Sequence, residues 1–231
     1  MQSLLLLHGA IGCEEQLKPL AEILSSNYDV HTLNFSGHGG KPFYAEPFSM
    51  HLFSNNILSY LQEKGIEKTS IFGYSMGGYV GMYLAKHYPE KLNALVTLAT
   101  KFHWTEEIAL KEVQMLDPEK ISSKVPAFAK TLEERHAPQD WRQVLAFTAE
   151  MMLQLGKDNV LKTPDHETIQ HPCLIMLGDR DKMVSLEETV NVYRSLPNSQ
   201  LAVLPNTPHP IEQVDKELLA YFIRRFIQSE F

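Results

Sequence analysis

An abrupt change from an apolar run to a helical run, within residues 69–87, constrains this chain more than any other feature. The β-type run 69–72 leads directly into Gly-Tyr-Ser-Met-Gly at residues 73–77, and a helical stretch continues to His87. A Gly-x-Ser-x-Gly pentapeptide between a strand and a helix is typical of a tight turn that exposes the serine above the sheet edge. The turn strains the serine and crowds its neighbours, so glycine is required on both sides. Ser75 is therefore the candidate nucleophile.

The length of 231 residues suits one domain with a full core, or a core with a small insertion. Lys and Arg number 21 against 28 Asp and Glu, and this balance of −7 argues against a nucleic-acid surface or a polybasic membrane patch. The two cysteines predict no disulfide framework and a reduced, cytoplasmic setting. The apolar run 4–7 is too short for a signal peptide or a membrane span, and we expect a buried strand there.

Short apolar runs alternate with amphipathic stretches along most of the chain. The expected strands are 3–7, 29–35, 69–72, 94–99, 173–177 and 201–204. The expected helices between and after them are 14–25, 50–64, 78–87, 186–196 and 212–228. This alternation predicts a mostly parallel sheet of about six strands with helices on both faces.

The segment 102–170 breaks this alternation, because it contains no good strand run. It predicts helices at 105–116, 126–135 and 138–155. We expect an all-helical cap or lid at 102–170, inserted between a first part of the core, 1–101, and a second part, 171–231.

A serine nucleophile needs a base to accept its proton and a carboxylate to orient that base. With this type of turn, the chain order is serine, acid, histidine, and the acid and histidine lie on loops at the same sheet edge. Asp179 and Asp181 both follow the expected fifth strand, and we favour Asp181 because residues 178–184 fit a G-x-x-D-x-x-V spacing. His209 follows the last strand and precedes the final helix, so it is the candidate base.

Negative charge that develops on a substrate oxygen needs two backbone N–H donors. The N–H of Met76 lies at the predicted helix N-terminus, where the helix dipole also favours an anion. His8-Gly9-Ala10 follows the first strand at the same edge, so the N–H of Ala10 is the expected second donor. We expect His8 to brace this loop rather than to transfer protons.

Taken in order, these motifs resemble those of the α/β-hydrolase superfamily. The matching positions are His8-Gly9, the turn at residues 36–39, the glycines and serine of 73–78, Asp181 and His209. The resemblance implies the α/β-hydrolase fold, a Ser-His-Asp triad and, in most members, an acyl-serine intermediate. The chain departs from the family turn D-x-x-G-H-G-x-S, because Asn34 replaces its acid and Lys41 its serine. The leading antiparallel strands of the family also have no counterpart here.

Two further patterns predict neither a metal nor a cofactor. Residues 166–171 resemble the zinc motif H-E-x-x-H, but they contain one residue too many and are followed by Pro172. The glycines of 37–40 lead into Lys41-Pro42 rather than into a helix, so they do not form a dinucleotide loop.

Five large side chains are candidates for the substrate pocket, with packing inside the core or the cap as the alternative. They are Tyr79, Trp104, Phe128, Phe147 and Met151. The identity of the substrate depends on such cap residues and cannot be derived from the fold.

The leading hypothesis is a serine hydrolase that cleaves a carboxylic ester or thioester of a small molecule, with no nucleic-acid or membrane partner. One alternative is a triad-dependent lyase that resembles the menaquinone-pathway SHCHC synthases with Ser-Met-Gly-Gly turns. Those enzymes commonly carry arginine directly after the paired glycines, where this chain has Tyr79. The other alternative is a non-catalytic, ligand-binding member of the fold.

Overall fold

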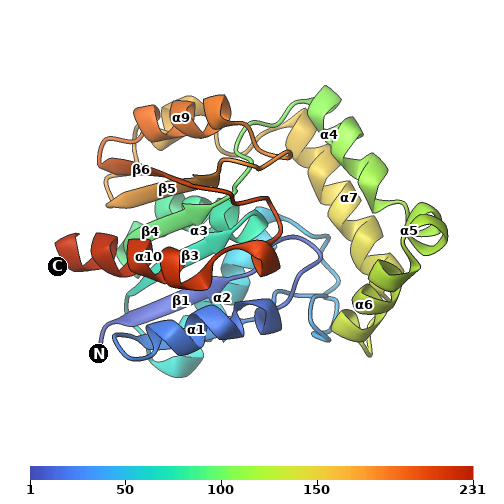
Figure 1. Ribbon diagram of the computed structural model, residues 1–231, viewed down its shortest axis with the longest axis horizontal. Coiled ribbons are helices and arrows are strands. Elements are labelled where there is room, and N and C mark those ends of the chain that lie inside the picture. Colours follow the sequence, from blue (N-terminus) through green and yellow to red (C-terminus); the bar gives the residue numbers. More distant parts are fainter. Residues whose placement is uncertain (231) are drawn as a thin grey trace.

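The computed structural model describes residues 1–230 and contains one six-stranded, fully parallel sheet (Figure 1). The strand order is β2-β1-β3-β4-β5-β6. The strands are β1 Ser3–Leu7, β2 Asp29–Leu33, β3 Thr69–Tyr74, β4 Leu92–Leu98, β5 Cys173–Gly178 and β6 Ser199–Leu204. The predicted six-stranded parallel sheet is confirmed, with strand ends that differ by up to two residues from those expected.

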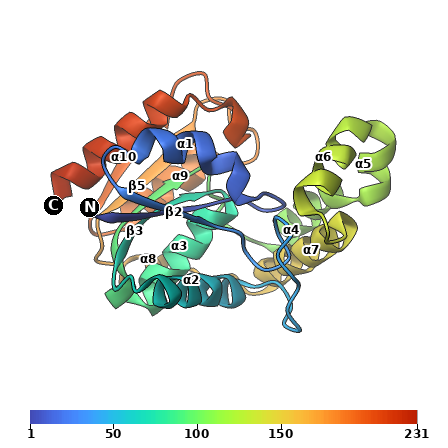
Figure 2. The same cartoon turned by 90° about the horizontal axis from the view of Figure 1, so that it is seen from below.

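Helices cover both faces of the sheet, as expected (Figure 2). On one face lie α1 (Lys18–Leu24) and α10 (Lys216–Glu230), and on the other α2 (Met50–Lys64), α3 (Met76–His87) and α9 (Leu186–Ser195). Successive residues of a strand point to opposite faces, so Leu4 and Leu6 pack toward α1 and α10, whereas Leu5 and Leu7 pack toward α2 and α3. The continuous apolar strands therefore contribute side chains to two hydrophobic cores, one on each face of the sheet.

The ends of α2 match the expectation at both residues because the local sequence specifies them. Ser49 Oγ accepts a hydrogen bond from the N–H of Leu52 at 3.0 Å and so caps the first turn. Gly65 ends the helix in the left-handed conformation, with φ of 66°, which glycine adopts without steric cost.

Between β4 and β5 the chain is helical, as predicted, but it forms more helices than the three expected. They are α4 (Glu106–Val113), α5 (Pro118–Lys124), α6 (Pro126–His136), α7 (Trp141–Lys157) and α8 (Thr163–His166). Helices α4 to α7 lie together beyond the carboxyl ends of the strands (Figure 1). Helix α8 returns to pack against α9. The missed α5 carries clear start signals, since Asp117 caps it and Pro118 is its first residue.

The strand order places a topological switch point between β1 and β3. From β1 the chain crosses to β2 on one side, and from β2 it crosses to β3 on the other side of β1. Ligands of parallel sheets bind outside the carboxyl ends of the strands at such a point. The loops after β1 and β3, which carry Gly9-Ala10 and Ser75, both begin there.

No helix within residues 1–230 is both long enough and apolar enough to cross a bilayer.

Candidate active site

Ser75 occupies the sharp turn between β3 and α3, with φ of 50° and ψ of −116°. A positive φ is strained for a residue that has a side chain, and it persists only where the surroundings enforce it. Two hydrogen bonds do so: Ser75 N–H donates to the carbonyl of Leu98 at 2.8 Å, and Thr100 Oγ1 donates to the carbonyl of Ser75 at 3.0 Å. The turn is thereby fixed to β4.

The glycines beside Ser75 are required by close backbone contacts. A Cβ at residue 73 would lie 2.4 Å from the backbone nitrogen and Cα of Gly78. A Cβ at residue 77 would lie 2.5 Å from the carbonyl oxygen of Leu7, at the end of β1. The first glycine therefore lets α3 fold back over β3, and the second lets α3 approach β1.

His209 and Asp181, predicted from chain order, are brought together. His209 Nδ1 donates to Asp181 Oδ2 at 2.8 Å. The carboxylate is buried, and its Oδ1 accepts from the N–H groups of Met183 at 2.8 Å and Val184 at 2.9 Å. Burial by itself raises the pKa of Asp181, but the hydrogen bonds from His209 and from these amides outweigh it and hold the pKa below its ordinary value. The carboxylate thus stays ionised and oriented.

Tyr74 joins the His209 loop to the serine turn. Its hydroxyl donates to the carbonyl of His209 at 3.0 Å, and the two ring centroids lie 5.6 Å apart. Within residues 1–230, no direct hydrogen bond joins the Ser75 and His209 side chains. Asp179 instead accepts a hydrogen bond from Thr207 N–H, in the loop after β6, at 3.0 Å.

The loop after β1 touches the serine turn directly. A Cβ at Gly9 would lie 3.2 Å from Ser75 Cβ and 2.8 Å from the ring of Tyr74. The loop closes as a four-residue turn, since Gly12 N–H donates to the carbonyl of Gly9 at 3.1 Å. Ala10 and Met76, the two predicted N–H donors, both line the cavity beside Ser75.

His8 is buried and braces the same loop, as expected. Phe35 N–H donates to His8 Nε2 at 3.2 Å, so the proton lies on Nδ1, which donates to the carbonyl of Gly9 at 2.8 Å. Burial lowers the pKa of His8 to about 4. Both ring nitrogens of His8 are therefore hydrogen-bonded to the backbone, one to Gly9 and the other to Phe35.

The cavity at Ser75 has a volume of about 50 Å³. Of the five pocket candidates it includes Tyr79, Trp104 and Met151, together with Met50, Met152, Lys101 and Leu155. The structure places the other two elsewhere: Phe128 is exposed on α6, and Phe147 packs against Phe43 and Phe48 with ring centroids 5.3 and 5.4 Å away. A wider groove of about 890 Å³ shares Lys101 and Trp104 with this cavity.

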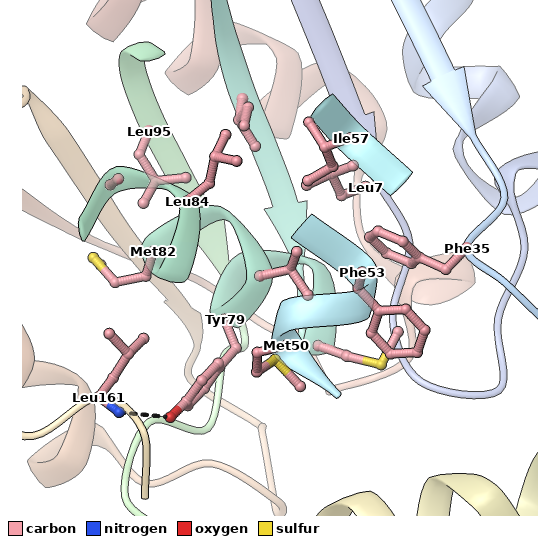
Figure 3. Close-up of a cluster of buried hydrophobic side chains, with 14 of the residues drawn as sticks. Leu7, Phe35, Met50, Phe53, Ile57, Tyr79, Met82, Leu84, Leu95 and Leu161 are labelled. Carbon is pink, nitrogen blue, oxygen red and sulfur yellow. Dashed lines mark hydrogen bonds between the residues drawn. The ribbon is translucent and has the colours of Figure 1, made fainter. Parts of the chain in front are cut away.

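Tyr79 is buried, and its hydroxyl ties α3 to the end of the helical insertion. The hydroxyl donates to Asn159 Oδ1. It also accepts from Leu161 N–H at 3.2 Å (Figure 3). Burial raises the pKa of Tyr79, so the phenol is neutral. The position that carries arginine in the synthases thus holds a neutral group engaged by two neighbours.

We expect Tyr79→Phe to lower the free energy of unfolding by about 1–3 kcal/mol, because a buried acceptor for Leu161 N–H and a donor for Asn159 are lost. Urea unfolding followed by circular dichroism measures this change. Tyr44→Phe, at an exposed tyrosine, is the control and should leave stability unchanged. Equal stability of Tyr79→Phe and wild type would show that these two contacts contribute nothing.

The zinc-like segment 166–171 has other contacts. His166 Nδ1 pairs with Ser195 Oγ at 3.3 Å, and His171 Nε2 pairs with the carbonyl of Pro89 at 2.9 Å. Across residues 1–230, no three His, Cys, Asp or Glu side chains converge in a way that could hold a metal ion.

The parallel sheet, the strained serine turn at its switch point and the adjacent Asp-His pair together define a protein of the α/β-hydrolase class. The sequence profile of the family "alpha/beta hydrolase fold" matches residues 2–117, just over half of the chain, and the chain belongs to this family.

Individual relatives resemble the chain over nearly its whole length. A protein of Shigella flexneri serotype 5b (strain 8401), named "Putative carbamate hydrolase RutD", is 25% identical over 92% of this chain and 86% of its own. The solved structure of a thermophilic esterase from Thermogutta terrifontis superposes with a TM-score of 0.80 at 21% identity, covering 100% of this chain and 90% of that one. MenH from S. aureus also superposes with a TM-score of 0.80 at 21% identity, over 99% and 94% of the two chains. These two structures share the fold.

Proposed function

We propose that this protein is a serine hydrolase that cleaves a carboxylic ester or thioester of a small molecule. The observation that carries the proposal is the buried Asp181 carboxylate, which lies 2.8 Å from His209 Nδ1 and accepts two further hydrogen bonds from backbone N–H groups. The Tyr74 hydroxyl connects the loop of His209 to the turn that holds Ser75. Relatives named as esterase and as carbamate hydrolase favour the same class of reaction.

In this mechanism Ser75 Oγ attacks the carbonyl carbon while His209 Nε2 accepts its proton. The N–H groups of Ala10 and Met76 bind the oxygen that becomes negative. Asp181 stabilises the imidazolium and fixes the tautomer in which Nδ1 carries a proton. Collapse of the intermediate breaks the bond to the alcohol or thiol, which takes the proton from His209. Water then attacks the acyl-serine with His209 as base, and the acid leaves.

The helical insertion serves as the cap of this site. Helix α7 supplies Met151, Met152 and Leu155 to the cavity at Ser75, and these apolar side chains exclude water from the reacting carbonyl. The lyase alternative is less favoured, because an anionic precursor would find the neutral Tyr79 where the synthases place arginine.

Covalent labelling tests this proposal. Reaction with a fluorophosphonate should add one adduct per chain, and peptide mass spectrometry should locate it on Ser75. A separate, unlabelled sample is offered p-nitrophenyl esters of increasing acyl length, with thioesters, carbamates and lactones. An adduct on another residue would contradict the assignment of the nucleophile. Release of pyruvate from an anionic precursor, without ester turnover, would favour the lyase. Binding of these compounds without any turnover would favour the non-catalytic, ligand-binding member of the fold.

A further inference from the structure

Ile11 lies in an unusual backbone conformation immediately after the predicted oxyanion donor Ala10. Its φ is 51°, and it is the third residue of the turn closed by Gly12 N–H and the carbonyl of Gly9. That position of such a turn normally requires glycine or asparagine. A β-branched residue with positive φ is a genuine outlier, and it is retained only where neighbouring groups enforce it.

The enforcing groups come from the helical insertion. Arg135 Nη1 and His136 Nε2, at the C-terminal end of α6, both donate to the carbonyl of Ile11, each at 3.0 Å. His136 is fully buried, and its Nδ1 accepts from Gly39 N–H at 3.2 Å, which leaves the proton on Nε2 for Ile11. Neither side chain lines the cavity at Ser75.

Arg135 also reaches the loop that carries the base. Its Nη2 lies 3.6 Å from Glu212 Oε1, three residues after His209, and Gln16 Nε2 donates to the same oxygen at 2.5 Å. Gln16 Oε1 in turn accepts a hydrogen bond from Cys13 N–H at 2.9 Å. Cys13 directly follows the turn 9–12, which carries the expected donor Ala10 and is called the oxyanion turn below. One guanidinium therefore bridges α6, the turn 9–12 and the loop after His209.

We propose that Arg135 and His136 are positioning residues that hold the oxyanion turn in its strained, active conformation, so that docking of α6 assembles the site. The inference rests on the proposed function, in which Ala10 N–H stabilises the oxyanion. Without the two donors, Ile11 relaxes to negative φ and the turn that carries Ala10 shifts. A shift of about 1 Å in a catalytic group can cost on the order of 100-fold in rate.

Arg135→Ala should lower kcat by about 10- to 100-fold and leave KM within about threefold, because the loss falls on the transition state. Arg135→Lys should recover part of the loss. Arg142→Ala removes an exposed arginine of the same insertion, which stacks on Trp141, and it should keep wild-type kcat. Should Arg135→Ala not fold, Arg135→Lys against Arg142→Lys supplies the same comparison.

A double-mutant cycle separates this role from a general effect on folding. Glycine adopts positive φ freely, so in an Ile11→Gly background the Arg135→Ala loss should shrink to less than about threefold. The proposal would be overturned if Arg135→Ala lowered kcat as much in the Ile11→Gly background as in the wild type. It would also be overturned if Arg135→Ala changed KM alone, or if Arg135→Ala and Arg142→Ala had equal kcat.

Amide hydrogen exchange provides a readout that does not depend on turnover. Exchange at residues 9–12 should accelerate at least tenfold in Arg135→Ala and stay unchanged in Arg142→Ala. Unchanged exchange there would overturn the positioning role whatever the reaction is. Conversely, a wild-type protein without Ser75-dependent turnover would refute the proposed function and leave the exchange result to decide this inference.

Discussion

Ser75→Ala is expected to lower kcat/KM toward the best ester of the panel by at least about 10⁴-fold, because removal of a triad nucleophile leaves only substrate binding and oxyanion stabilisation. The fold should survive the change. The contacts that hold the turn are made by the backbone of Ser75, whose N–H bonds Leu98 and whose carbonyl bonds Thr100, and alanine retains both groups. Steady-state kinetics with thermal melting measures both effects.

Ser26→Ala is the matched control, since this exposed serine lies in the loop after α1 and donates only locally. It should keep wild-type activity. His209→Ala should cost about as much as Ser75→Ala, and the double variant no more than either, because the groups act as a unit. Retention of a tenth or more of wild-type activity by Ser75→Ala would identify a different nucleophile.

The sheet and the serine turn could be predicted because their signals are local. Most of the strands contain an apolar run bounded by glycine, proline or polar residues. Gly73, Gly77 and Gly78 lie where a Cβ would clash with neighbouring atoms. The choice of Asp181 and His209 then needs the chain order that accompanies this type of turn, together with the rule that loops after parallel strands lie at one end of the sheet. The 2.8 Å contact between His209 and Asp181 agrees with that placement.

The interior of the helical insertion could not be predicted in the same way. The aromatic character of Phe128 and Phe147 suggested a pocket, but which face of a helix meets the site depends on how the helices pack together. Phe147 faces Phe43 and Phe48, and Phe128 faces solvent. The sequence also holds no signal for the contact of His136 with Ile11, 125 positions away.

Acidification is expected to destabilise the protein well before its carboxylates titrate. Four histidines are almost fully buried: His8, His38, His136 and His166. Burial lowers the pKa of His8, His136 and His166 from 6.5 to about 4, and that of His38 well below 6.5. Between these values the unfolded chain binds protons that the folded protein excludes. Stability is therefore full above pH 6.5 and falls as the pH drops toward 4.

The expected slope is roughly 1.4 kcal/mol per pH unit for each buried histidine, so two or three of them offset a typical total stability of about 5–15 kcal/mol near pH 4. Urea unfolding at pH 7, 6, 5 and 4.5 measures this slope. His136→Gln keeps a donor for Ile11 and an acceptor for Gly39, but glutamine does not titrate. The slope of its unfolding free energy against pH should therefore be shallower by the contribution of one histidine. His103→Gln, at an exposed histidine, should parallel wild type. A flat profile between pH 6.5 and 4.5 would mean that these histidines accept protons without loss of the fold.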